Sequence, residues 1–166
     1  SHIKRDSNPE KISKLVKLAD SLVQIYEITS SKDWKWFEDK LTYSNPSLSE
    51  ALFLAYDITK DKKYLKIAEE SFTFLSNIVF VNGCLHPIGE SGWCKRSGER
   101  AFFDQQPLDA ASMVQTCLEA YKITGNKDYH KKAILAFNWF LGKNHLNQMM
   151  YDESTGGCYD GLSKNN

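Results

Sequence analysis

Apolar residues recur at intervals of three and four along five stretches of the chain. Each stretch begins with a helix-capping signal; the starts are Asn8-Pro9, Pro46, Asp61, Pro107 and Asn126. A polar cap residue or a proline ahead of a 3.6-residue apolar period is typical of an α-helix. The first helix is expected to run to about Ile28. No run alternates as a strand does, so the pattern predicts an all-α protein.

The second stretch carries the fullest start signal. Asn45 or Ser44 precedes Pro46, which suits the first helical position. Ser47 and Glu50 have the spacing of a capping box, in which each side chain bonds to the other's backbone N–H. We therefore expect Ser47 and Glu50 to bond within their own helix.

The chain also contains an internal repeat. The segment 55–74 aligns without gaps on 120–139, a shift of 120 − 55 = 65 residues. The matching pairs are Ala55/Ala120, Tyr56/Tyr121, Ile58/Ile123, Thr59/Thr124, Lys62/Lys127, Tyr64/Tyr129, Lys66/Lys131, Ala68/Ala133 and Phe72/Phe137. Each copy reads as a helix, a tight turn and a second helix. Repeated helical hairpins build arrays in which each unit buries its apolar face on the next, as a superhelix or a closed ring.

Composition narrows the class of protein. The 166 residues are 42% apolar, which suits one domain spanning 1–166. Lys plus Arg equals Asp plus Glu at 21 each, so no basic field attracts nucleic acid. No apolar run reaches the roughly 20 residues of a membrane span, and no signal peptide opens the chain, so we expect a cytoplasmic location. The four cysteines and four histidines show no metal-ligand spacing, and neither a metal nor a cofactor is implied.

Two long polar connections, 82–106 and 144–166, separate and follow the hairpins. Loops of this length in a compact domain are usually functional or disordered, and their aromatic content argues against disorder. Both follow the second helix of a hairpin, so we expect them to emerge at the same end and form one aromatic-walled mouth. Flat apolar faces combined with carboxylates and amides suit a carbohydrate.

Candidate site residues come from these two loops. If the domain catalyses, Asp104 is the expected general acid or base, with Glu99 or Asp152 as the opposing carboxylate. The expected substrate-binding residues stack on sugar rings or bond to hydroxyls: Trp93, Arg100, Gln105, Gln106, Tyr151 and Asp160.

Several of these residues, and other aromatic and histidine side chains, also have a structural interpretation. Asp104 lies just before the helix that starts at Pro107, so it can serve as a cap. Asp152 and Asp160 precede turn residues and can make side-chain turns. Arg100 can form an ion pair with Glu99 or Asp104. Trp34, Trp36 and Phe37 have spacings that core packing explains, and His86 has no evident partner.

Four motifs in order carry a resemblance: "WKWFEDKLTYSNPSLSEALFLAY", "HPIG…GW…RAFFDQQPLDA", "WFLGKN" and "YDESTGGCYDGL". Together they resemble the helical domain found behind glycosyltransferase domains in many bacterial and archaeal proteins. That domain is similar to the six-hairpin (α/α) toroids, the fold of N-acylglucosamine 2-epimerases and of several glycoside hydrolases and lyases. The resemblance covers about Trp34 to Leu162 and implies a glycosyltransferase domain as partner.

A complete toroid of six hairpins needs on the order of 300 residues. The resemblance therefore implies an incomplete (α/α) toroid of helical hairpins, part of a longer chain or an arc whose open edge another copy covers in a homo-oligomer.

The favoured function is a carbohydrate-active or carbohydrate-binding domain associated with a glycosyltransferase. The alternatives are a helical-repeat domain that binds proteins and a glycoside hydrolase with paired carboxylates. Epimerase chemistry needs bases that move a proton from a sugar carbon, for which only His86 and His145 are candidates. With only these two candidates, the sequence does not favour it.

Overall fold

A computed structural model describes residues 8–96 and 98–164. The ends of the expected 1–166 domain, and Ser97, lie outside the described residues. The described part is mostly helical, as predicted: α2 (Pro9–Thr29), α3 (Pro46–Thr59), α4 (Lys62–Val79), α5 (Pro107–Thr124) and α6 (Lys127–Asn138). Two short antiparallel pairs were not predicted: β1 (Lys40–Leu41) with β4 (Cys94–Lys95), and β2 (Phe80–Val81) with β3 (Cys84–Leu85). No helix within these residues is both long and apolar enough to cross a membrane.

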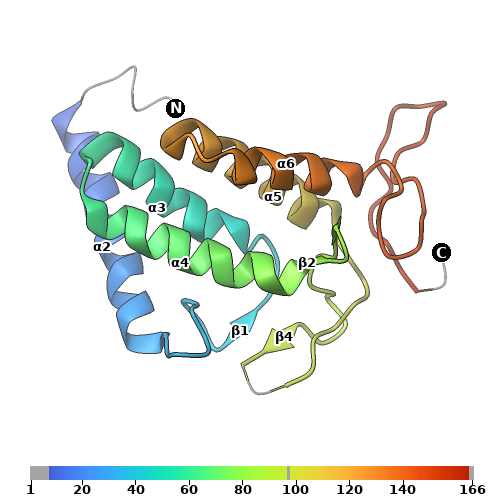
Figure 1. Ribbon diagram of the computed structural model, residues 1–166, viewed down its shortest axis with the longest axis horizontal. Helices are drawn as coiled ribbons and strands as arrows, with labels where there is room; N and C mark the ends of the chain where they lie inside the picture. The colour runs from blue at the N-terminus through green and yellow to red at the C-terminus, as the bar shows by residue number, and fades with distance from the viewer. Residues whose placement is uncertain (1–7, 97, 165–166) are drawn as a thin grey trace.

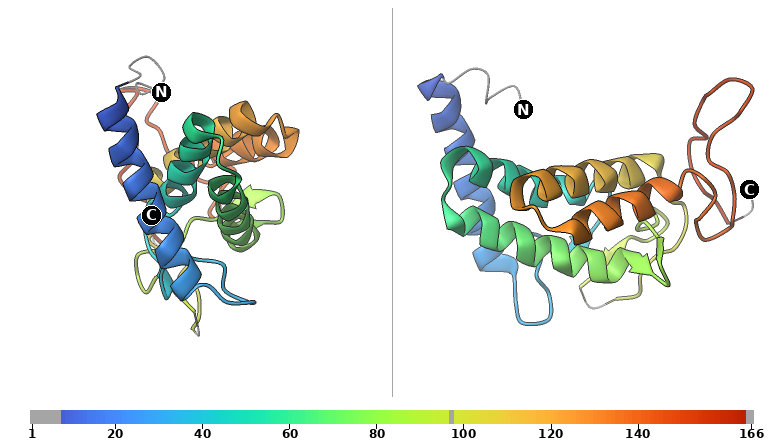
Figure 2. Two further views of the ribbon diagram at one scale, coloured as in Figure 1. Left: turned by 90° about the vertical axis from the view of Figure 1, so that its left-hand side faces the viewer. Right: turned by 45° about the horizontal axis from the view of Figure 1, so that its top comes forward.

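The helices form two hairpins and a flanking helix. α3 packs against α4, α5 against α6, and α3 against α5, while α2 packs on the first hairpin. α2 lies at one edge of the molecule and the C-terminal loop beyond α6 at the opposite edge (Figure 1). The turned views confirm that α2 runs alongside the hairpins rather than between them (Figure 2). The arrangement is the array of hairpins that the repeat predicts.

The repeat extends to the geometry of the turns between paired helices. Lys60 and Gly125 both adopt the left-handed conformation, with φ of 61° and 73°. The next residues, Asp61 and Asn126, share φ −74° and ψ 113°, and each accepts a hydrogen bond from an N–H two residues on. The expected caps at these positions are confirmed. The two copies of the repeat therefore form the same turn, as the alignment of the segments 55–74 and 120–139 predicts.

Aromatic side chains fill the core. Trp36 and Trp139 are completely buried, and Phe53, Phe72 and Tyr129 meet edge to face with ring centroids 5.5 to 6.3 Å apart. The core interpretation of Trp34, Trp36 and Phe37 is confirmed, since all three are buried. Ala55 and Ala120, a matching pair in the repeat, are fully buried. Small residues there let neighbouring helices approach closely.

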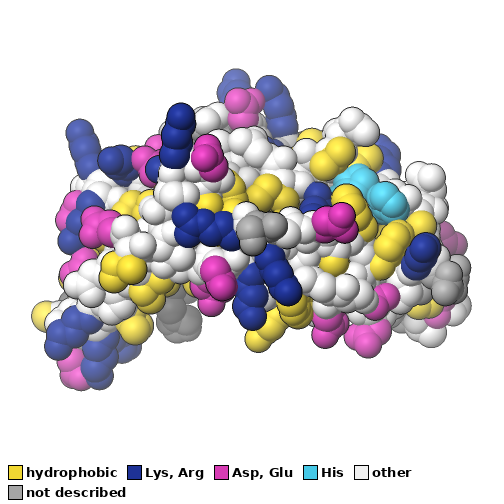
Figure 3. All heavy atoms as spheres, turned by 90° about the horizontal axis from the view of Figure 1, so that it is seen from below, with side chains coloured by type: hydrophobic (Ala, Val, Ile, Leu, Met, Phe, Trp, Pro, Cys, Tyr) yellow, Lys and Arg dark blue, Asp and Glu magenta, His cyan; other side chains and the backbone are white. Residues whose placement is uncertain are grey.

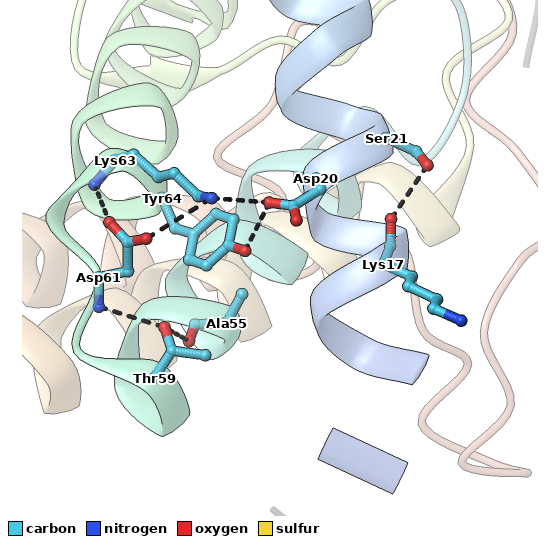
Figure 4. A network of polar contacts seen from close by, with 8 residues as sticks. All are labelled: Lys17, Asp20, Ser21, Ala55, Thr59, Asp61, Lys63 and Tyr64. Atoms are coloured by element: carbon cyan, nitrogen blue, oxygen red, sulfur yellow. Dashed lines mark hydrogen bonds and ion pairs between the residues drawn. The ribbon is translucent and has the colours of Figure 1, made fainter. Parts of the chain in front are cut away.

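A polar contact fixes α2 against the start of α4 (Figure 4). The Tyr64 hydroxyl donates to Asp20 Oδ1 at 2.7 Å, and Lys63 Nζ lies 2.8 Å from the same oxygen. Hydrogen bonds from Lys63 and then Tyr64 lower the pKa of Asp20. Further along, the Tyr26 hydroxyl donates to Glu70 at 2.9 Å. Because these bonds join the middle and the last turn of α2 to α4, they set the register between the two helices.

The predicted capping box at α3 is wrong. Glu50 is buried, and its carboxylate accepts from Gln115 Nε2 at 2.7 Å and from Thr116 Oγ1 at 3.4 Å, both on α5. The Asn45 side chain makes no cap bond and instead pairs with the backbone of Thr42. A buried carboxylate needs hydrogen-bond donors, and α5 supplies them. Glu50 therefore joins the two hairpins rather than capping its own helix.

Candidate functional site

The two long loops meet at one end of the array, as expected. Gln105 and Leu162 exchange backbone hydrogen bonds, N to O at 3.0 Å and 2.8 Å, although they lie in different loops. The C-terminal loop folds back beside the end of the hairpins (Figure 1). The loops therefore form a single surface.

Two histidines, one from each loop, are in contact on this surface. His86 Nδ1 and His145 Nδ1 lie 3.1 Å apart, and the rings meet edge to face at 5.1 Å. At this distance one ring donates its N–H and the other accepts. Figure 3 shows adjoining histidine side chains bordered by hydrophobic ones. The expectation that His86 is a loop residue without a partner is therefore wrong.

Two phenylalanines border the pair. Phe102 stacks on the His145 ring with centroids 5.9 Å apart, and Phe103 meets it edge-on at 5.3 Å. Phe102 is exposed and Phe103 is half-buried. The Phe102-Phe103 dipeptide therefore packs around His145 and offers an apolar face beside the nitrogen atoms.

Burial and nearby positive charge make His86 a neutral base. Its pKa is lowered first by burial, then by His145 and Arg100, which oppose its protonation. Because the ordinary histidine pKa is about 6.5, a lowered value keeps the ring unprotonated at neutral pH. His86 can therefore accept a proton from a bound molecule.

Arg100 lies beneath the pair and is bonded to carbonyl oxygens. Nη1 donates to Ile78 O at 2.5 Å, and Nη2 donates to the carbonyls of His86 and Pro87. The guanidinium carbon lies 4.9 Å from the centre of the Phe102 ring. Burial lowers the pKa of Arg100. The cation expected to pair with Glu99 or Asp104 thus holds loop backbone instead, because burial of the guanidinium requires nearby acceptors.

Asp104 lies at the edge of the same surface and joins the two loops. Ser91 Oγ donates to its Oδ2 at 2.9 Å, and hydrogen bonds from Ser163 and then Ser91 lower its pKa. Neither donor belongs to α5, so these bonds do not cap that helix. Gln106 Nε2 donates to Glu90 at 2.6 Å. Glu99 is exposed.

Gln105 lies under the surface. It is fully buried, accepts from Trp139 Nε1 at 2.9 Å and donates to Phe102 O at 2.9 Å. Its amide is therefore already bonded within the protein, and it links the core tryptophan to the Phe102 backbone.

The remaining candidates are bonded or packed within their own segments or exposed. Trp93 is half-buried and packs against Tyr43 at 6.0 Å. Asp152 accepts from Ser154 N and Oγ and from Thr155 Oγ1, and these bonds lower its pKa. It makes the side-chain turn that its sequence context suggests. Tyr151 is half-buried beside it and Asp160 is exposed.

No cluster of metal-binding side chains occurs in the described segments. In residues 8–96 and 98–164, no three His, Cys, Asp or Glu side chains come close enough together to hold a metal ion. Cys84, Cys94, Cys117 and Cys158 are free thiols.

No protein family and no curated protein matches the sequence. Among solved structures, a D-mannose isomerase matches with a TM-score of 0.73 and 15% identity, over 98% of this chain and 45% of that one. A sugar epimerase from a ruminal bacterium matches with a TM-score of 0.69 and 15% identity, over 98% of this chain and 42% of that one.

The chain shares its fold with both enzymes. It spans less than half the length of either. The expected likeness to an epimerase fold is confirmed, whereas the expected fusion to a glycosyltransferase stays a prediction.

Proposed function

We propose that this domain binds a saccharide on the surface formed by its two loops, and that His86 and His145 move a proton at a sugar carbon next to a carbonyl group. This is the reaction class of aldose–ketose isomerases and of epimerases that act beside a carbonyl. The observation that carries the proposal is the contact between the two imidazoles.

The pair suits this chemistry because the reaction removes a proton and returns one. A neutral His86 can act as the base, since its lowered pKa leaves a lone pair available. Each ring uses Nδ1 in the contact, so Nε2 is its remaining nitrogen. A proton taken by one ring can be stabilised by the lone pair of the other, which allows return to a different carbon or face.

The surroundings favour a sugar as the bound molecule. Phe102 and Phe103 provide apolar ring surface beside the imidazoles, which suits the C–H face of a pyranose. Ser91 and Gln106 provide hydrogen-bonding groups near Asp104 and Glu90. The two structural neighbours act on sugars by name, which is consistent with this assignment.

Glycoside hydrolysis by Asp104 with Glu99 or Asp152 remains an alternative prediction. Its general acid must hold a proton. Hydrogen bonds lower the pKa values of Asp104 and Asp152 and so favour their ionised forms. The observed environment therefore supports the histidine pair better than the carboxylates.

A protein-interaction role has an observation of its own. On α2, Leu18 and Ile28 are 71% and 85% exposed, and a groove of about 410 Å³ runs beside Leu22, Ala51 and Leu54. A helical partner of the same array fits such an apolar face. We propose accordingly that the chain is an arc of a larger toroid. A homo-oligomer and an association with a glycosyltransferase remain proposals from the resemblance, and a cytoplasmic location remains a proposal from the sequence.

Proton transfer is tested in heavy water. The protein is incubated with D-mannose, D-glucose and D-fructose, and ¹H NMR follows the loss of the proton on the carbon next to the carbonyl. We expect exchange with the wild type, and its loss in His86→Gln and in His145→Gln. His130→Gln is the control, because His130 packs on Tyr121 in the second hairpin.

The outcomes separate the parts of the proposal. Exchange that persists in His145→Gln would exclude the pair as the catalyst. Binding shifts without exchange would overturn the catalytic part, and the absence of both with all three sugars would overturn the saccharide assignment.

A further inference from the structure

We infer that Arg100 is a positioning residue that holds His86 and His145 in contact, acting through the His86 backbone on one side and the Phe102 ring on the other. The inference deepens the proposed function and rests on the pair being its working groups. The sequence placed Arg100 among residues that touch substrate, whereas its contacts point inward.

The first side of this arrangement is the end of α4. The last carbonyls of a helix have no partner within the helix. Two of them are used here: Ile78 O accepts from Arg100 Nη1, and Val79 O accepts from the His86 backbone N–H at 2.7 Å. Arg100 Nη2 then donates to the carbonyl of His86 itself. Both backbone groups of His86 are therefore tied to the same helix end, one directly and one through the guanidinium.

The second side runs through an aromatic ring. The Arg100 guanidinium carbon lies 4.9 Å from the Phe102 ring centre, and Phe102 stacks on His145 with an interplanar angle of 29°. A cation on a ring face stabilises the ring where it lies. Arg100 thereby contacts one histidine through its backbone and the other through Phe102, so one planar group sets the separation of the two imidazoles.

Only arginine can make this set of contacts. Its planar guanidinium presents five N–H donors in a fixed fork and a flat face for stacking, whereas a lysine ammonium is a compact charge without a face. Ile78, His86 and Pro87 supply acceptors from two chain segments. Lysine at this position would keep the positive charge and lose the geometry.

The positive charge acts on the pair as well. The titratable groups that shift the His86 pKa are His145 and Arg100, in addition to burial. All three favour the neutral form of His86. Replacing Arg100 therefore changes two measurable properties, the position of the rings and the titration of His86.

The test uses Arg100→Lys and Arg100→Gln in the full chain, with Arg96→Lys as the control. Arg96 lies in the same loop and donates Nη1 to Thr29 O, away from the histidines. Two-dimensional NMR follows the ring signals of His86 and His145 through a pH titration without sugar. Unfolding by urea is measured in parallel.

We expect Arg100→Lys to raise the His86 pKa toward its ordinary value, because the loosened loop admits water. His145 should lose the ring-current shift caused by Phe102. Arg100→Gln should raise the His86 pKa further, since the charge is also removed. In the sugar-exchange assay kcat should fall at least ~10-fold with KM little changed, as expected for lost alignment. Arg96→Lys should match the wild type in every measurement.

The inference would be overturned if folded Arg100→Lys kept the His86 titration and the His145 ring-current shift of the wild type. If neither Arg100 variant folds, Phe102→Leu supplies the test, because it keeps the carbonyl bonds and removes only the stacking. It should weaken the nuclear Overhauser contact between the His86 and His145 rings and raise the His86 pKa, because His145 moves away; an unchanged contact and titration would overturn the inference. Altered histidine titration in a protein that exchanges no sugar proton would refute the proposed function alone.

Discussion

The carboxylate of Asp109 accepts a hydrogen bond at 2.7 Å from the backbone N–H of Ser44, which precedes it by 65 residues. Asp109 lies in the first turn of α5 and is buried, and Leu75 and Met113 line the small cavity beside it. The bond joins the turn before α3 to the start of α5. Burial nevertheless dominates and raises the Asp109 pKa to about 7.

This raised pKa makes stability depend on pH in a definite direction. Between pH 4 and 7 the folded state keeps a proton on Asp109 that the unfolded chain releases, so this group's contribution to stability is lost as pH rises through about 7. We expect Asp109→Asn to remove this slope, a difference on the order of 2 to 4 kcal/mol between pH 4 and 8. Asparagine keeps an acceptor for the Ser44 N–H.

Urea unfolding of both proteins from pH 4.5 to 8 measures the slope. Asp128→Asn is a control at the start of α6, where Asp128 is exposed and paired with Lys131. Equal pH dependence in wild type and Asp109→Asn would show that Asp109 is ionised in the folded protein.

Gln105→Leu should destabilise the protein strongly. The change removes the acceptor for Trp139 Nε1 and the donor to Phe102 O, and the buried indole N–H is left without a partner. We expect a loss of about 2 to 3 kcal/mol in the free energy of unfolding, measured with urea. The adjacent Gln106→Leu is a matched comparison, because Gln106 is half-buried and bonds to exposed Glu90. A similar loss in both variants would contradict the special role of the buried amide.

Gly89→Ala should disrupt the first loop. A Cβ at this position would overlap the backbone atoms of Phe103, which cannot move as a flexible side chain can. We expect a loss of about 2 kcal/mol or more and changed NMR signals of the neighbouring loop. Gly157→Ala places its Cβ against only the Thr155 side chain and should cost less. Equal stability of Gly89→Ala and the wild type would show that the loop is packed differently.

Lys60→Gly should stabilise the first hairpin. Lys60 occupies the left-handed conformation that glycine holds at the matching position Gly125. We expect a gain of about 0.5 kcal/mol, since relief of the strained backbone exceeds the loss of the exposed pair with Asp57. The reverse change, Gly125→Ala, should cost about 1 kcal/mol. Thermal unfolding measures both, and a loss in Lys60→Gly would indicate that the side-chain contacts outweigh the backbone.

The helices and their turns followed from local signals in the sequence. A proline or a cap residue ahead of an apolar period is enough to start a helix, and the repeat fixed the pairing of the hairpins. Glu50 shows where such reasoning fails, because a capping box and a buried partner compete for one carboxylate. The donors that bond to the Glu50 carboxylate, Gln115 and Thr116, lie 65 and 66 residues further along the chain.

The sequence predicted which loops form the candidate site but not which side chains come into contact there. That the two loops share one end followed from their positions after paired helices. The contact of His86 with His145 did not, because it depends on loop backbone that Arg100 and Phe102 shape. Gln105 had the composition expected of a sugar ligand, yet its amide bonds to Trp139 and Phe102. Burial of a polar side chain in a loop has no periodic signal in the sequence.

The reciprocal bonds between Gln105 and Leu162 have a dynamic consequence. Because this bridge, the His86–His145 contact and the bond from Ser163 to Asp104 all join the two loops, we expect both segments to open as one cooperative unit of local unfolding. Amide hydrogen exchange at the two positions then reports a common opening free energy. A molecule that contacts only one loop therefore also restrains the other, which couples the residues from both loops through a single equilibrium.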